Sequence, residues 1–275
     1  MPHQEEKAFF DPSEVCVIVS RRLAAAVAVL ALLPVSALIA GCGDAAEPPE
    51  SSAPQSTEPP EPSVPQSTEP PVDGGAPKGA VPASLASAES AAEDLIDEAL
   101  AGRRDQVVAN ADELAMVASG PLAAALRKAG VAPAEISSFQ RRALEVKRLA
   151  PRAPLIDVAL ASNHAFELMP DFFARFDVDA PPDVTRLDYL DFEAKLQSKA
   201  GDAAKLGSAV RRLGGVWTRL RPEVVRAGGR KAAADYDAHV KAMIGLSGNA
   251  HAAATQQEAQ HGLDLVDAIE HVFAP

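Results

Sequence analysis

A segment rich in proline, serine, threonine and acidic residues, positions 43–83, divides this chain. It holds seven acidic residues and one lysine, has no aromatic residue and offers almost nothing apolar to bury. Such a composition cannot offset the conformational entropy lost on folding, so the sequence predicts a disordered tether here. Residues 84–275 alone are long enough and apolar enough to form a packed domain.

The tether contains an internal repeat. Pro54-Gln55-Ser56-Thr57-Glu58-Pro59-Pro60 returns as Pro65-Gln66-Ser67-Thr68-Glu69-Pro70-Pro71. Repeats of this kind expand where only length and stiffness matter. About 40 residues in extended polyproline conformation reach on the order of 100 Å. The sequence therefore predicts a spacer, and docking through its PxxP-like stretches is the alternative.

The body, residues 84–275, is expected to be all-α. It is built mainly from Ala, Leu, Val, Arg, Asp and Glu, and it lacks the turn signals of β-hairpins. One apolar stripe has the spacing 4-3-4-3 of a helix face, and it consists of Leu206, Val210, Leu213, Trp217 and Leu220. Asp202 is the expected N-cap of this helix, and Pro222 is expected to open the next one.

Further breakers divide the body into an antiparallel helical bundle. After Pro181-Pro182, a helix is expected to start at Asp183 and Thr185. Gly228-Gly229 and Ser247-Gly248-Asn249 mark two later stops. We expect three or four helices on each side of a connector at Asp177–Asp183.

The two sides resemble each other at an offset of 97 positions. Phe139 then falls on Tyr236, His164 on His261, Glu167 on Asp264, and Phe176 on Phe273. The offset predicts two similar helical units, residues 84–176 and 184–275, packed about a pseudo-twofold axis. Chance similarity between two alanine-rich helical segments is the alternative.

The repeat draws attention to two histidine–carboxylate pairs. His164 and Glu167, and likewise His261 and Asp264, lie three residues apart and therefore on adjacent turns of one helix. Glu258 adds a carboxylate one turn earlier. We expect both histidines on apolar seams, so that facing helices assemble a site for a first-row transition metal. The alternative is a pair of ordinary core histidines, each hydrogen-bonded to a neighbour.

The segment Asn163-His164-Ala165-Phe166-Glu167 resembles the GxHxxE signature of imelysin-like proteins, which are exported helical-bundle proteins linked to iron uptake. The resemblance covers about six residues, and Ser162 stands where that signature has glycine. It implies that His164 and Glu167 are metal ligands.

The start of the chain has the order of an export signal. Arg21 and Arg22 precede the apolar run Leu23–Ile39, and small residues follow in Leu38-Ile39-Ala40-Gly41-Cys42. This pattern resembles the lipobox of bacterial lipoproteins. The resemblance implies that residues 1–41 are removed and that lipidated Cys42 begins the mature chain. It implies a lipid anchor on the extracytoplasmic side of a membrane of the cell envelope.

Three alternatives remain open for this region. The run Leu23–Ala40 has the length of a membrane-spanning helix, although it contains Pro34. Residues 1–20 are long for a signal and could lie upstream of the true start of translation. The pair Arg21-Arg22 also fits a twin-arginine signal, so both export routes remain.

Composition excludes several classes of function. Cys16 would leave with the signal and Cys42 would carry lipid, so no thiol would remain for a disulfide, a metal or a nucleophile. Residues 42–275 contain 34 acidic and 23 basic residues, a net charge of −11, and nucleic acid is therefore not an expected partner. The acids of residues 177–188 fit a calcium loop poorly, because Pro182 stands where glycine is needed.

These observations favour a lipid-anchored binding or structural module over an enzyme. Its expected partners are the membrane, through the anchor, and another envelope protein, and no cofactor is expected. A periplasmic helical bundle that binds a transition metal is the alternative.

Overall fold

The apolar stripes of the body become the buried faces of helices. The computed structural model describes residues 78–247 and 252–274, and these ranges are all-α. The lipobox, Cys42 and nearly all of the predicted tether lie outside the described residues. The helices are α1 (Ala83–Leu100), α2 (Arg104–Ser119), α3 (Pro121–Lys128), α4 (Pro133–Leu149), α5 (Leu155–Phe166), α6 (Met169–Phe173), α7 (Asp183–Ala200), α8 (Ala203–Arg226), α9 (Arg230–Leu246) and α10 (Ala252–Phe273).

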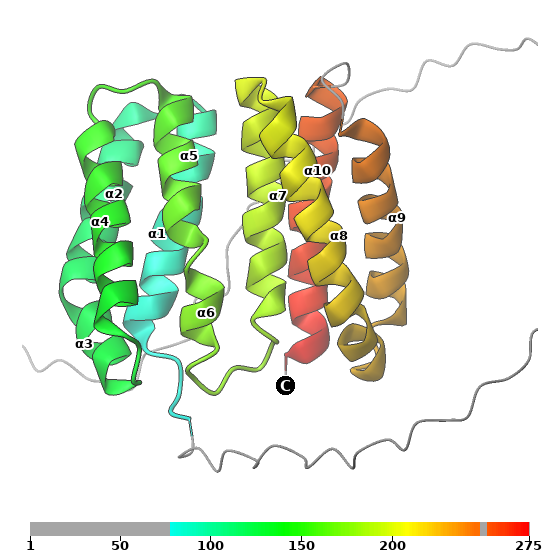
Figure 1. Ribbon diagram of the computed structural model, residues 1–275, viewed down its shortest axis with the longest axis horizontal. Helices are drawn as coiled ribbons and strands as arrows, with labels where there is room; N and C mark the ends of the chain where they lie inside the picture. The colour runs from blue at the N-terminus through cyan, green and yellow to red at the C-terminus, as the bar shows by residue number, and fades with distance from the viewer. Residues whose placement is uncertain (1–77, 248–251, 275) are drawn as a thin grey trace, which may run out of the picture. The chain divides into compact units, whose positions relative to one another are not determined.

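The long helices form two antiparallel groups of four (Figure 1). In the first group α1 packs on α2, α2 on α4, α4 on α5, and α5 returns to α1. The second group closes in the same way through α7, α8, α9 and α10. Short loops join successive helices, as expected for up-and-down bundles. The all-α prediction is confirmed for the described part of the chain.

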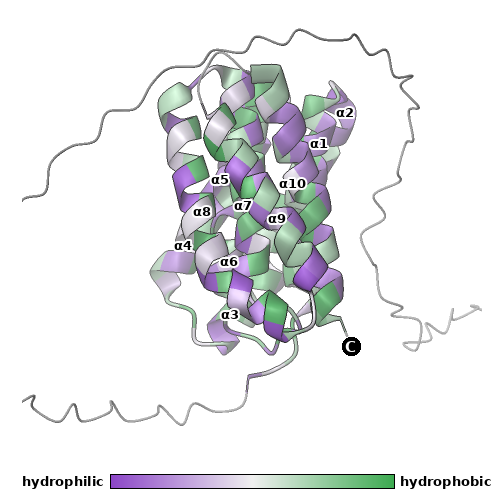
Figure 2. Ribbon diagram, turned by 90° about the vertical axis from the view of Figure 1, so that its right-hand side faces the viewer, coloured by the Kyte–Doolittle hydropathy of each residue, from purple (hydrophilic) through white to green (hydrophobic). Residues whose placement is uncertain are grey.

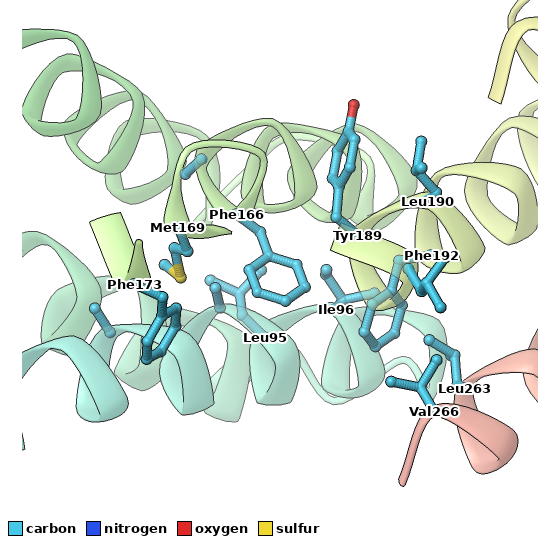
Figure 3. Packing of buried hydrophobic residues seen from close by; sticks show 14 of the residues in the cluster. Leu95, Ile96, Phe166, Met169, Phe173, Tyr189, Leu190, Phe192, Leu263 and Val266 are labelled. Atoms are coloured by element: carbon cyan, nitrogen blue, oxygen red, sulfur yellow. The ribbon is translucent and has the colours of Figure 1, made fainter. Parts of the chain in front are cut away.

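The two groups share one continuous core. Helix α5 packs on α7, and the rings of Phe166 and Phe192 meet edge to face across this contact, with centroids 6.3 Å apart. Leu95 and Ile96 of α1 and Leu263 of α10 extend the same cluster on either side (Figure 3). All five side chains are fully buried, and each contributes about 1.5–3 kcal/mol through burial. Figure 2 shows hydrophilic and hydrophobic residues alternating around the helices, as amphipathic packing requires.

Local signals in the sequence set most helix ends. All members of the stripe from Leu206 to Leu220 are buried on α8. The Asp202 side chain caps α8 by accepting a hydrogen bond from the Lys205 backbone N–H, with a donor–acceptor distance of 3.0 Å. Gly201 ends α7 with a φ of 78°, a left-handed conformation that favours glycine.

The prediction that Pro222 opens a new helix is wrong. Helix α8 continues through Pro222 to Arg226. Proline removes one backbone hydrogen bond, to the carbonyl of Thr218, but both residues are exposed, so water can satisfy that carbonyl. The buried side chains of Leu220 and Val224 hold both sides of the proline against the core.

Helix bounds follow the offset seen in the sequence. Helices α4 and α9 both begin and end 97 residues apart, and α5 and α10 begin 97 residues apart. The first group also carries the short helices α3 and α6, whereas the second has no short helix among its described residues. The geometry agrees with two similar units, and their duplication stays a prediction.

The chain enters the helical body beside the connector between the groups. The Asp177 backbone N–H donates to the Gly79 carbonyl at 2.8 Å, and Ala80 forms an isolated parallel bridge with Asp177. Helix α1 then begins at Ala83, one residue before the predicted start of the body. Across residues 78–247 and 252–274, none of the helices combines the length and apolarity needed to span a membrane.

Candidate functional site

The first predicted pair lies at the end of α5, and its histidine is not on an apolar seam. The His164 side chain is 60% exposed, whereas Ser162, Ala165 and Phe166 of the same helix are fully buried. The prediction that His164 lies on an apolar seam is therefore wrong. The face of α5 that packs on α1 and α7 lies about 100–200° around the helix axis from the His164 side chain, because its residues are one or two positions away along the chain.

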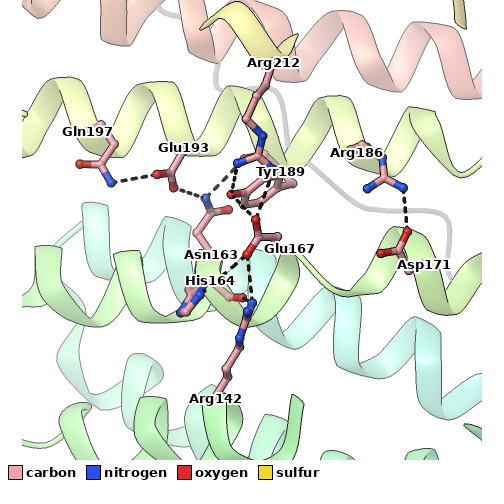
Figure 4. A network of polar contacts seen from close by, with 10 residues as sticks. All are labelled: Arg142, Asn163, His164, Glu167, Asp171, Arg186, Tyr189, Glu193, Gln197 and Arg212. Atoms are coloured by element: carbon pink, nitrogen blue, oxygen red, sulfur yellow. Dashed lines mark hydrogen bonds and ion pairs between the residues drawn. The ribbon is translucent and has the colours of Figure 1, made fainter. Parts of the chain in front are cut away.

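Glu167 is the centre of a polar network that joins both helix groups (Figure 4). Arg142 Nη1 of α4 donates to Glu167 Oε2 at 3.1 Å and also to the His164 backbone carbonyl. The Tyr189 hydroxyl of α7 and Arg212 Nη2 of α8 both donate to Glu167 Oε1 at 3.2 Å. The Arg212 guanidinium also lies 5.3 Å from the centre of the Tyr189 ring. One carboxylate thus connects α4 and α5 to α7 and α8.

This network weakens the case for a metal at Glu167. Burial acts to raise the pKa of Glu167, but hydrogen bonds from Arg142 and Arg212 outweigh burial and hold that pKa below its usual value. His164 Nε2 lies 3.8 Å from Glu167 Oε2. A divalent cation at this position would have to displace or oppose two guanidinium groups. The arrangement is that of an ion-pair network.

The second predicted pair is also exposed. His261 and Asp264 are exposed on α10, and Asp264 accepts a hydrogen bond from Gln260 Nε2 at 3.1 Å. The predicted seam through His261 is therefore wrong as well. Glu258 binds His239 instead of serving beside His261. Within residues 78–247 and 252–274, no three His, Cys, Asp or Glu side chains are grouped so that they could hold a metal ion.

A buried polar network inside the second group was missed by the sequence reasoning. His239 of α9 is fully buried, with Nε2 3.0 Å from Asp191 Oδ1 of α7 and Nδ1 2.9 Å from Glu258 Oε1 of α10. The Tyr236 hydroxyl donates to Asp191 Oδ2 at 2.8 Å. The sequence feature that could have revealed this network is Gly262, a glycine in the middle of an expected helix. A Cβ there would lie 2.5 Å from His239 Nε2 and 2.6 Å from the Asp191 carboxylate.

The pKa values of the buried groups in this network depend on one another. Burial acts to lower the pKa of His239, but the hydrogen bonds and charges of Asp191 and Glu258 outweigh it and raise that pKa above its usual value. Burial raises the pKa of Asp191, and the bonds from His239 and Tyr236 oppose this rise. Both ring nitrogens of His239 already face carboxylates, so the network is closed and holds a proton between α7, α9 and α10.

Two hollows lie on the surface of the described residues. The first, about 430 Å³, is lined by residues of α4 and α5, namely Ser138, Arg141, Arg142, Glu145, Ala161 and His164. The second, about 410 Å³, lies at the connector and includes Glu89, Asp177, Asp179 and Glu270.

Asp183, a member of the rejected calcium pattern, instead binds Arg186 at 3.0 Å and Arg219 at 3.2 Å.

Burial, together with the charges of Glu93 and Glu270, raises the pKa of Glu89 well above its usual value. The lining of the second hollow contains four acidic residues and no basic one, whereas that of the first contains two arginines and one glutamate.

Comparison of the chain with models of protein families, with characterised proteins and with solved structures gives no match.

Proposed function

We propose that this chain is a lipid-anchored protein of the bacterial cell envelope, with a helical body that acts as a binding or structural module. The observation that carries the proposal is the lipobox Leu38–Cys42, followed directly by a proline-rich spacer. Acylation of Cys42 would supply stable membrane attachment, because more than one acyl chain is then anchored. The spacer would hold the body away from the lipid surface.

The body needs no particular redox environment. No cysteine follows Cys42, so the body depends on packing and not on a redox state. The shared core and the bonds of Glu167 to Arg142 and Arg212 hold the two helix groups together. A body of this kind is suited to presenting fixed surfaces to a partner.

The proposal is tested by replacing Cys42 with serine. The lipoprotein pathway cleaves only after the cysteine is acylated, so C42S should take up no labelled fatty acid and should remain uncleaved. The matched control is C16S, which removes the other cysteine and should be labelled and processed like the wild type. Labelling of C42S at the wild-type level would refute the proposal.

A further inference from the structure

We propose that the hollow between α4 and α5 binds a tetrahedral oxyanion, namely a phosphate or sulfate group of a small molecule or a lipid. The inference deepens the proposed binding function and rests on it, since it names the ligand class that the module would take. The hollow has a volume of about 430 Å³, which exceeds the size of one such group and leaves space for the rest of a ligand.

The charged side chains that line the hollow leave an excess of one positive group. They are the guanidinium groups of Arg141 and Arg142 and the carboxylate of Glu145. Glu145 and the neighbouring Glu167 are already engaged. Arg148 holds Glu145 through bonds of 2.6 and 2.7 Å, and Arg142 and Arg212 hold Glu167. The chain as a whole has a net charge of −12, so this is a local reversal of sign.

Several donors of the hollow remain available for an anion. Arg141 is exposed and forms no ion pair within the described part of the chain. Arg142 uses Nη1 for its bonds to Glu167 and to the His164 carbonyl, which leaves Nη2 and Nε for a ligand. The Ser138 hydroxyl and the His164 imidazole line the same space. A guanidinium fork held in place by other bonds is well suited to a phosphate or sulfate group.

His164 makes the expected binding depend on pH. Burial and the charge of Arg142 lower the pKa of His164, while Glu167 and Glu193 oppose this shift. Arg141 and Glu145 also face the imidazole across the hollow. His164 is therefore neutral at neutral pH and becomes a cation in acid. Anion binding should strengthen as pH falls, whereas metal binding to the same imidazole would weaken.

The test is a titration of the full chain, in a non-ionic detergent, with sodium sulfate at constant ionic strength. Sulfate keeps its charge between about pH 5 and 8, so the pH dependence reports the protein alone. Nuclear magnetic resonance of labelled imidazole groups follows His164 directly, and H164Q identifies its signal. We expect saturable binding that is stronger at about pH 5.5 than at about pH 8.

Two arginine variants separate a site from general surface charge. R141Q should weaken sulfate binding about tenfold, the value expected for losing one charged hydrogen bond. R127Q removes the same charge from an exposed arginine of α3 that forms no ion pair among the described residues, and it should change the affinity less than twofold. Circular dichroism checks that both variants retain wild-type helicity.

Three results of the titrations would overturn the inference: no saturable binding, equal losses of affinity in R141Q and R127Q, or a pH dependence of binding that is unchanged in H164Q. Two competitors then identify the source of the anion. Displacement of sulfate by water-soluble dihexanoyl phosphatidylglycerol assigns a lipid headgroup, and displacement by inorganic phosphate alone assigns a soluble phosphate. Failure of both competitors also overturns the inference. The outcome is independent of C42S labelling, so the two proposals can fail separately.

Discussion

Gly262 of α10 permits the closest helix approach in the buried network, and G262A is the sharpest test of that network. A Cβ at this position would lie 2.5 Å from His239 Nε2 and 2.6 Å from Asp191 Oδ2. Both side chains are fully buried, and both are held by further hydrogen bonds, to Glu258 and to Tyr236. Neither can move aside without breaking the contact between His239 and Asp191.

The expected cost of G262A follows from three terms. Alanine favours the helix over glycine by about 1 kcal/mol. Loss of a buried, charge-assisted hydrogen bond costs about 1.5–3 kcal/mol. Crowding of a packed core costs about 1–3 kcal/mol more. The variant should therefore lower the free energy of unfolding by about 1.5–5 kcal/mol.

Urea unfolding of residues 75–275, followed by circular dichroism, measures this loss. The matched control is G215A on α8, where an added Cβ meets no atom within 4 Å. Because only helix propensity acts there, G215A should raise stability by up to about 1 kcal/mol. If G262A is as stable as the wild type, the close approach of α10 to His239 and Asp191 is refuted.

Three further predictions concern the titratable groups. The raised pKa of His239 means that its stabilising contribution is complete below about pH 6.5 and is lost as pH rises through its folded-state pKa. The free energy of unfolding of the wild type should therefore fall as pH rises through this range, and that of H239Q should vary less. Parallel plots of stability against pH for the two proteins would contradict a stabilising role for protonated His239. The lowered pKa of Glu167 gives a contribution that is present above about pH 4.3 and lost as pH falls through its folded-state pKa. E167Q should lower the free energy of unfolding by about 1–2 kcal/mol at neutral pH, a modest value because the Glu167 side chain is 29% exposed. The variant should also lack the loss of stability that the wild type shows in acid. An E167Q variant with the wild-type acid profile would exclude a stabilising role for the Glu167 carboxylate. Calorimetric titration with zinc should show no stoichiometric binding at His164, because Glu167 is held by two arginines. Zinc binding that disappears in H164L would restore the metal interpretation.

Local sequence signals were sufficient for most of the fold. The spacing from Leu206 to Leu220 predicted a buried helix face, and Asp202 marked the start of α8 correctly. These signals act within one or two turns of a helix, so they can be recognised without knowledge of the partners. Pro222 was misread because its tolerance depends on the exposure of Thr218, which is a tertiary property.

The candidate sites were harder to predict, because burial depends on which face of a helix meets its neighbours. His164 and His261 were assigned to apolar seams, yet both are exposed. His239 showed no recognisable spacing in the sequence, because its partners Asp191 and Glu258 come from two other helices, 48 and 19 residues away. Helix α7 packs on α5, α8 and α10, so it buries polar groups on several faces and presents no single apolar stripe.

The offset of 97 residues relates the two networks to each other. It aligns Arg142 with His239 and Ala165 with Gly262. On α10, the missing Cβ of Gly262 leaves space for His239 to remain inside against Asp191. On α5 the matching position is the buried Ala165, and Arg142 donates to the His164 carbonyl. Under the predicted duplication, one helix pair would carry a closed network and the other a solvent-open basic hollow, and the exchange of histidine for arginine and of glycine for alanine would accompany this divergence.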